Sequence, residues 1–143
     1  MSSSADIHTD TPVGINVPAA SAWLDTLFGD NKTSTLTPIR GGGSCEIYEL
    51  MRGEQRLVIR KAPKVLVADS AHNVLREFQI IEALQSSKVR VPQVFGACDD
   101  RKIADAPFYV MAFIDGSVVR RRLPQNYQLA PAQQSSIGTD LID

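Results

Sequence analysis

The stretch Leu57–Leu84, LVIRKAPKVLVADSAHNVLREFQIIEAL, decides the fold that we expect for this chain. Its first part is rich in β-branched and apolar residues, which predicts a strand over Arg56–Arg60. Its second part repeats apolar residues at helical spacing, which predicts a helix over Ala71–Gln85. The sequence therefore predicts a strand that ends on the basic residue Arg60 and a long helix that carries Glu77. The apolar stripe of that helix consists of Ala71, Val74, Leu75, Phe78, Ile81 and Leu84.

Upstream of this stretch, the pattern changes from a helix to strands. Apolar residues at helical spacing predict a helix over Ala19–Phe28. Thr35–Ile39 and Cys45–Leu50 favour strands, and the glycines Gly41–Gly43 separate them. The short Gly-containing segment Arg52-Gly53-Glu54 predicts a turn that joins the second and third strands as an antiparallel hairpin.

Downstream, two further strands are expected at Val94–Cys98 and Phe108–Ile114, the second of them buried on both faces. The predicted fold is therefore α+β, with a five-stranded antiparallel sheet and one long helix inserted after the third strand. Three regions are expected: a disordered tail over residues 1–16, a folded lobe over 17–116, and a linker with the start of a helix over 117–143.

Composition indicates one ordinary globular domain. The 143 residues are 43% hydrophobic and 22% charged, and the formal net charge is −1. Such a balance argues against a dedicated nucleic-acid binder, which normally carries a basic excess. No apolar run reaches the ~18 residues of a membrane span. Two isolated cysteines, Cys45 and Cys98, and two histidines without metal-ligand spacing fit a reducing cytosol, so a cytoplasmic protein is expected.

Four stretches in order carry a resemblance: GGGSCEIY (Gly41–Tyr48), VIRKAP (Val58–Pro63), SAHNVLREFQIIEAL (Ser70–Leu84) and PFYVMAFIDG (Pro107–Gly116). Together they resemble the amino-terminal lobe of the aminoglycoside-phosphotransferase-like kinases, in the branch related to acyl-CoA-dehydrogenase-fused phosphotransferases. In kinase-like lobes a glycine loop covers the ATP phosphates, a basic residue on the third strand contacts them, and a helix Glu pairs with that residue.

The resemblance implies a nucleotide site and a cofactor, ATP with Mg²⁺. Phosphates would be contacted by the loop and the end of the third strand, with Glu77 holding Arg60. The pair Arg60-Lys61 leaves open which side chain makes the contact. Adenine would bind to the hinge, which is the segment Phe108–Gly116. The expected site residues are Gly41, Gly42, Gly43, Ser44, Arg60, Lys61, Glu77, Met111, Ala112 and Ile114.

The sequence also departs from the family pattern. Gly43 and Cys45 stand where many members have Gln and Asn, and Ala112 replaces an acidic hinge residue. No H-x-D-x-x-x-x-N pattern follows Ile114, so no catalytic base or metal ligand is expected in this chain. The expectation is therefore a nucleotide-binding lobe of a phosphotransferase acting on a small-molecule hydroxyl acceptor, with the C-terminal lobe missing and the chain inactive alone.

Other interpretations of the same residues stay open. The glycines could form a plain turn, and Arg60 or Glu77 could be ordinary solvated charges. The chain could be a non-catalytic kinase-like interaction module, which could self-associate through apolar surface around Phe108–Ile114 that would otherwise face a catalytic lobe. It could also be a plain α+β domain with coincidental motifs. ATP binding separates the first interpretation from the others.

Overall fold

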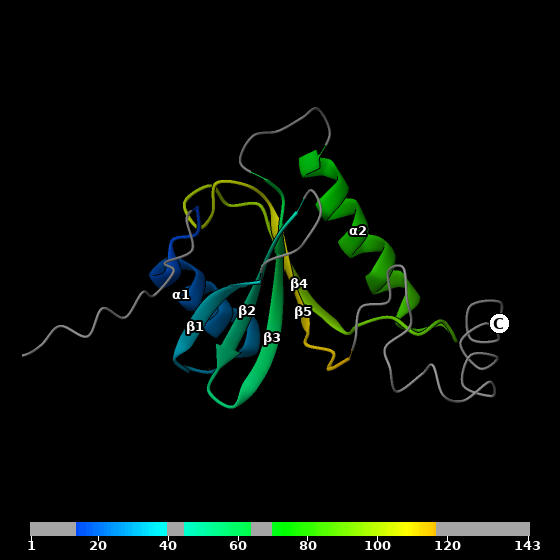
Figure 1. Ribbon diagram of the computed structural model, residues 1–143, viewed down its shortest axis with the longest axis horizontal. Helices are drawn as coiled ribbons and strands as arrows, with labels where there is room; N and C mark the ends of the chain where they lie inside the picture. The colour runs from blue at the N-terminus through cyan, green and yellow to red at the C-terminus, as the bar shows by residue number, and fades with distance from the viewer. Residues whose placement is uncertain (1–13, 40–44, 64–69, 117–143) are drawn as a thin grey trace, which may run out of the picture. The chain divides into compact units, whose positions relative to one another are not determined.

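The computed structural model describes residues 14–39, 45–63 and 70–116, and all its elements fall there (Figure 1). The elements in chain order are α1 (Val17–Phe28), β1 (Ser34–Ile39), β2 (Glu46–Arg52), β3 (Gln55–Lys61), α2 (Ser70–Leu84), β4 (Val94–Cys98) and β5 (Phe108–Ala112). The chain divides into two compact units, residues 1–113 and 114–143, and all seven elements belong to the first.

The five strands form one antiparallel sheet in the order β1-β2-β3-β5-β4, which confirms the predicted fold class. Gly53, at φ +60°, allows the tight turn between β2 and β3, where Arg52 pairs with Gln55. Pro38 lies in the edge strand β1, where its missing N–H breaks no second ladder. The central strand β3 pairs with β2 on one side and with β5 on the other.

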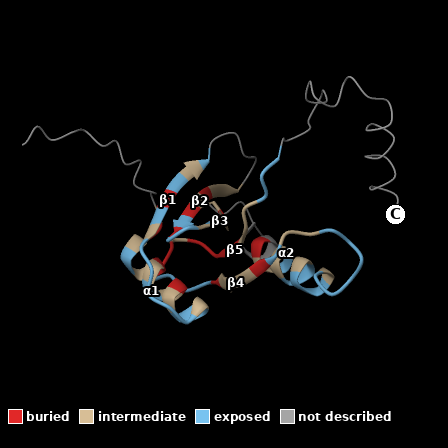
Figure 2. Ribbon diagram, turned by 90° about the horizontal axis from the view of Figure 1, so that it is seen from below, coloured by how far each residue is buried: buried red, intermediate tan, exposed pale blue. Residues whose placement is uncertain are grey.

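The two helices pack on opposite faces of this sheet, because successive side chains of a strand point to opposite faces. On β5, Phe108 and Val110 join the apolar cluster that contains Leu24 of α1. Tyr109 lies between them in sequence and joins the other cluster, with Val74 of α2. The buried residues of the central strands therefore lie between α1 and α2 (Figure 2).

Helix α1 begins two residues earlier than predicted because Asn16 caps it. The Oδ1 of Asn16 accepts a hydrogen bond from the backbone N–H of Ala19, and Gly29 ends the helix at φ +69° in the left-handed region. Trp23 of this helix meets Phe108 edge to face, with ring centroids 5.3 Å apart. Helix α2 covers Ser70–Leu84, within one residue of the prediction at each end.

Further boundaries also differ from the prediction, and β3 extends one residue at each end, to Gln55 and Lys61. Strand β2 runs through Arg52, which is fully buried rather than part of the turn. Strand β5 ends at Ala112 rather than Ile114. Ile15, expected in the tail, is buried and bridges to Ala104. Phe108–Val110 of β5 are buried in the core of the first unit, so they do not supply the exposed surface that was expected for self-association.

Within the described ranges no helix is both long and apolar enough to cross a membrane. The linker and the start of a helix predicted over residues 117–143 lie outside those ranges, as does most of the predicted tail.

Gly14 offers a test of how tightly the N-terminal segment packs. It has φ +92°, and a Cβ at this position would meet the carboxylate of Asp105. Gly29 also has positive φ, but a Cβ there meets nothing within 4 Å. We expect Gly29→Ala to lower the free energy of unfolding by about 1–2 kcal/mol, the cost of left-handed backbone for a residue with a Cβ.

Gly14→Ala should cost clearly more in urea denaturation, because the same backbone strain is added to a steric clash. Equal losses for the two variants would show that the contact of Gly14 with Asp105 is loose.

Candidate functional site

The predicted ion pair between Arg60 and Glu77 is present. Arg60 is the penultimate residue of β3, and Glu77 lies midway along α2, on the side that faces the sheet. The Nε of Arg60 lies 3.0 Å from the Oε1 of Glu77. The N–H group is not aligned for a hydrogen bond, so this contact is electrostatic. Both side chains are about one-third exposed, at 33% and 35%, so this pair stands at the margin of the core and can be reached by a ligand.

Tyr109 also contacts Glu77, a contact that the sequence did not indicate. Tyr109 stands opposite Arg60 in the register of β3 and β5, so both side chains point toward α2. Its hydroxyl donates a 2.6 Å hydrogen bond to the same Oε1 of Glu77. The ring lies 5.9 Å from that of Phe78, the next residue of the helix. Tyr109 therefore fixes the height of α2 above the sheet.

The electrostatics of the site keep Tyr109 neutral. Burial raises the pKa of Tyr109, and the hydrogen bond to Glu77 and the negative charge of that carboxylate raise it further. The positive charge of Arg60 acts in the opposite direction. The hydroxyl is therefore a stable hydrogen-bond donor at physiological pH.

The side chain of Lys61 points to the other face of the sheet. It is fully buried, and its Nζ lies 2.8 Å from Glu46 Oε2 and 2.6 Å from Asp105 Oδ1. Adjacent residues of a strand alternate between faces, so the geometry favours Arg60 as the side chain available to a ligand on the α2 side.

The predicted hinge residues Met111 and Ala112 end β5, and Ile114 follows two residues later. Met111 is half-buried against the cluster that contains Tyr109. The backbone N–H of Ala112 donates a 2.8 Å hydrogen bond to the carbonyl of Gln93, so this amide is already used inside the fold. Ile114 begins the second unit and its side chain is exposed. The next residue inward, Phe113, is held by the guanidinium of Arg56, which lies 3.6 Å from its ring centroid.

The glycine loop Gly41–Gly43 with Ser44 lies outside the described residues. Cys45 follows it, half-buried and with a free thiol. Cys98 is a buried free thiol whose pKa is raised by burial, so it is a poor nucleophile. Within the described ranges, no three His, Cys, Asp or Glu side chains gather as a metal site.

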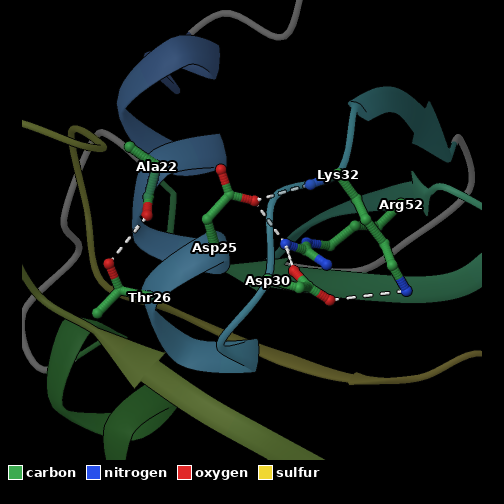
Figure 3. Close-up of polar contacts among 6 residues, drawn as sticks. All are labelled: Ala22, Asp25, Thr26, Asp30, Lys32 and Arg52. Carbon is green, nitrogen blue, oxygen red and sulfur yellow. Dashed lines mark hydrogen bonds and ion pairs between the residues drawn. The ribbon is translucent and has the colours of Figure 1, made fainter.

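A second buried cation, Arg52, lies at the far end of β2 (Figure 3). Its guanidinium bonds to Asp25, at 2.5 Å, and to Asp30, and it stands 5.0 Å from the ring centroid of Phe28. The hydrogen bond from Arg52 lowers the pKa of Asp30. This cluster ties α1 to the sheet.

Beside the Arg52 cluster lies an open hollow of about 400 Å³, and none of the predicted site residues lines it. Its lining consists of Val17, Pro18, Ser21, Asn31, Lys32, Thr33 and Ser34.

Comparison with known proteins agrees with the fold. The family model of the phosphotransferase enzyme family (APH) matches residues 35–143. A crystal structure of a "putative aminoglycoside phosphotransferase" from Ralstonia eutropha superposes with a TM-score of 0.69 at 24% identity, over 86% of this chain and 34% of that one. An antiparallel five-stranded sheet with α2 packed beside the end of β3 is thus the N-terminal lobe of the kinase-like fold.

The chain belongs to the APH phosphotransferase family. Curated relatives include mouse "Acyl-CoA dehydrogenase family member 10", 32% identical over 85% of this chain, and human "Acyl-CoA dehydrogenase family member 11", 34% identical over 81%. The chain covers 11% and 15% of the length of these two relatives. The family resemblance predicted from the four sequence stretches is confirmed.

Two buried tyrosines predict how stability depends on pH. Burial raises the pKa of Tyr48, as it does that of Tyr109, and Glu46 adds to the effect through its charge and a hydrogen bond. Above pH about 10 the unfolded chain loses these protons while the folded chain keeps them. The free energy of unfolding should then fall by about 1.4 kcal/mol per pH unit for each group.

Urea denaturation between pH 8 and 11.5 measures this slope. In Tyr109→Phe the fall above pH 10 should be shallower by the contribution of one group, and below pH 9 the variant should show only the constant loss of the hydrogen bond to Glu77. An unchanged alkaline slope would mean that Tyr109 ionises normally in the folded protein.

Proposed function

We propose that this chain is the nucleotide-binding lobe of an ATP-dependent small-molecule phosphotransferase. The observation that carries the proposal is the pairing of Arg60 with Glu77 on the α2 side of β3, with Tyr109 beneath them. A partly exposed guanidinium, held at one nitrogen by a carboxylate, has its remaining donors free to bind phosphate oxygens. Arginine is suited to this because its planar fork matches phosphate geometry.

At the phosphate end, Arg60 clamps the ATP phosphates and the backbone amides of Gly41–Ser44 cover them. Glu77 holds Arg60 in place, and Tyr109 holds Glu77. Phosphoryl transfer depends mainly on positioning and on charge stabilisation, so this arrangement contributes by fixing one cation where the phosphates lie. Lys61 has no part in phosphate contact, because its ammonium group is buried between two carboxylates on the opposite face.

At the adenine end, Met111 forms part of the wall and the end of β5 supplies a polar contact. The carbonyl of Ala112 is the group proposed to meet the adenine edge. The amide of Ala112 is excluded because Gln93 accepts its hydrogen bond. Side-chain recognition at this hinge position is absent, because Ala112 carries no polar group.

The whole protein's reaction belongs to the proposal as well. It transfers the γ-phosphoryl group of ATP to a hydroxyl-bearing small molecule, with Mg²⁺ neutralising charge on the phosphates. No residue described here is assigned as catalytic base or as ligand of the magnesium ion. The acceptor, the base and the metal ligands are therefore expected in chain beyond this lobe, and residues 1–143 alone should transfer no phosphate.

Isothermal titration with MgATP tests the proposal on the 143-residue chain. Arg60→Ala should weaken ATP binding by about tenfold or more, because a charge-assisted contact to phosphate is lost. Arg76→Ala is the matched control: Arg76 is the neighbour of Glu77 on α2 but is exposed, so its removal should leave the affinity unchanged.

Adenosine binding should be the same in the wild type and in Arg60→Ala, because adenosine has no phosphate. A wild-type chain that binds no ATP, or an Arg60→Ala variant that binds it normally, contradicts the proposal. The first outcome would favour the non-catalytic interaction module, for which sedimentation of the same samples would report self-association.

A further inference from the structure

Lys61 forms a buried cluster of charges with Glu46 and Asp105 on the face of the sheet opposite Arg60. The Nζ of Lys61 contacts Glu46 Oε2 at 2.8 Å and Asp105 Oδ1 at 2.6 Å, and it donates a 3.1 Å hydrogen bond to the carbonyl of Ala62. Tyr48 donates a 3.1 Å hydrogen bond to the same oxygen of Glu46. The side chain of Lys61 is 0% exposed, so its three ammonium protons are directed to acceptors of the protein.

The cluster joins three segments that are distant in sequence. Glu46 is the first residue of β2, and Lys61 is the last residue of β3. Asp105 lies in the loop before β5, where its amide donates a 2.9 Å hydrogen bond to the carbonyl of Gly14. The loop before β5 and the ends of two strands therefore meet at one ammonium group, and the N-terminal segment is bonded to that loop through Gly14.

A lysine is rarely buried, because removal of its charge from water is costly unless carboxylates compensate for it. Replacement by an apolar residue would often be as stable, so a buried pair is weak evidence for stability alone. The cluster instead fixes the orientation of the end of β3. Because the buried ammonium group of Lys61 is bound on three sides, this end of the strand cannot rotate about its axis.

Arg60 precedes Lys61 directly and projects from the opposite face. Any rotation that releases Lys61 from its carboxylates also turns Arg60 away from Glu77, because the two side chains share one stretch of backbone. We propose that Lys61, held by Glu46 and Asp105, is a positioning residue that aims Arg60 at the nucleotide phosphates. This inference rests on the proposed function for its phosphate role.

The variants Asp105→Asn and Glu46→Gln test this. Each keeps the shape of a side chain and removes one of the two charges that hold Lys61. The chain offers a matched control in Asp30→Asn, because Arg52 is also a fully buried cation between two carboxylates, but at the opposite end of β2. All three variants weaken a buried ion pair, and only the first two act next to Arg60.

Affinity for ATP and for adenosine should respond differently. In Asp105→Asn and Glu46→Gln the Kd for MgATP should rise by about tenfold, while the Kd for adenosine stays within about twofold of the wild type. In Asp30→Asn both constants should stay unchanged at a similar loss of stability in urea. Equal weakening of ATP and adenosine binding, or an unchanged Kd for ATP, would overturn the positioning role.

A second measurement needs no nucleotide. The NMR resonance of the Arg60 Nε–H group, assigned by its loss in Arg60→Ala, reports the position of Arg60 beside Glu77. It should shift in Asp105→Asn and stay in place in Asp30→Asn. If the wild type binds no ATP, the proposed function fails and the phosphate role of Lys61 with it. If the resonance does not shift in Asp105→Asn, Lys61 does not determine the position of the Arg60 side chain, and the proposal is wrong whatever the result with ATP.

Discussion

The alternation of side chains at the end of β3 is the constraint on which the site depends. Two basic residues stand next to each other in sequence, and the pleat of the strand sends them to opposite faces. Arg60 meets Glu77 of α2, and Lys61 meets Glu46 and Asp105. A slip of one residue in the register of β3 would exchange the two environments, so the apolar residues that set this register also determine which cation faces α2.

Three cations of the first unit differ in how many carboxylates they contact and in how far they are buried. Arg52 and Lys61 are fully buried, and each is held by two carboxylates. Arg60 is one-third exposed and contacts one carboxylate oxygen, which also accepts the Tyr109 hydroxyl. A fully buried cation between two carboxylates stabilises an arrangement of segments. A partly exposed cation beside one carboxylate is oriented and still able to bind an anion, which is what the proposed phosphate contact requires.

The family assignment gives these contacts their context. The chain spans about a third of the solved phosphotransferase that it superposes on, and much less of the curated relatives. In the proposed function this lobe supplies position and charge, while acceptor choice and proton transfer need groups from elsewhere. The hydrogen bond from Tyr109 to Glu77 shows that the lobe keeps α2 close to the sheet through its own residues.

The sequence by itself determined the elements and the pairing of Arg60 with Glu77, because strand and helix periodicity are local properties and the four stretches follow one another in a known order. Only the tertiary structure placed Arg60 and Lys61 in different environments and revealed Tyr109 as a partner of Glu77. It also buried Arg52, which had been expected in a turn, and Ile15, which had been expected in the tail. Each of these depends on which segments meet across the sheet. Residues 32 to 44 positions apart, such as Tyr109 with Glu77 and Asp105 with Lys61, leave no periodic signal in the sequence. The pairing of β3 with β5 brings Asp105 close to Lys61, and the packing of α2 on the sheet brings Glu77 to Tyr109.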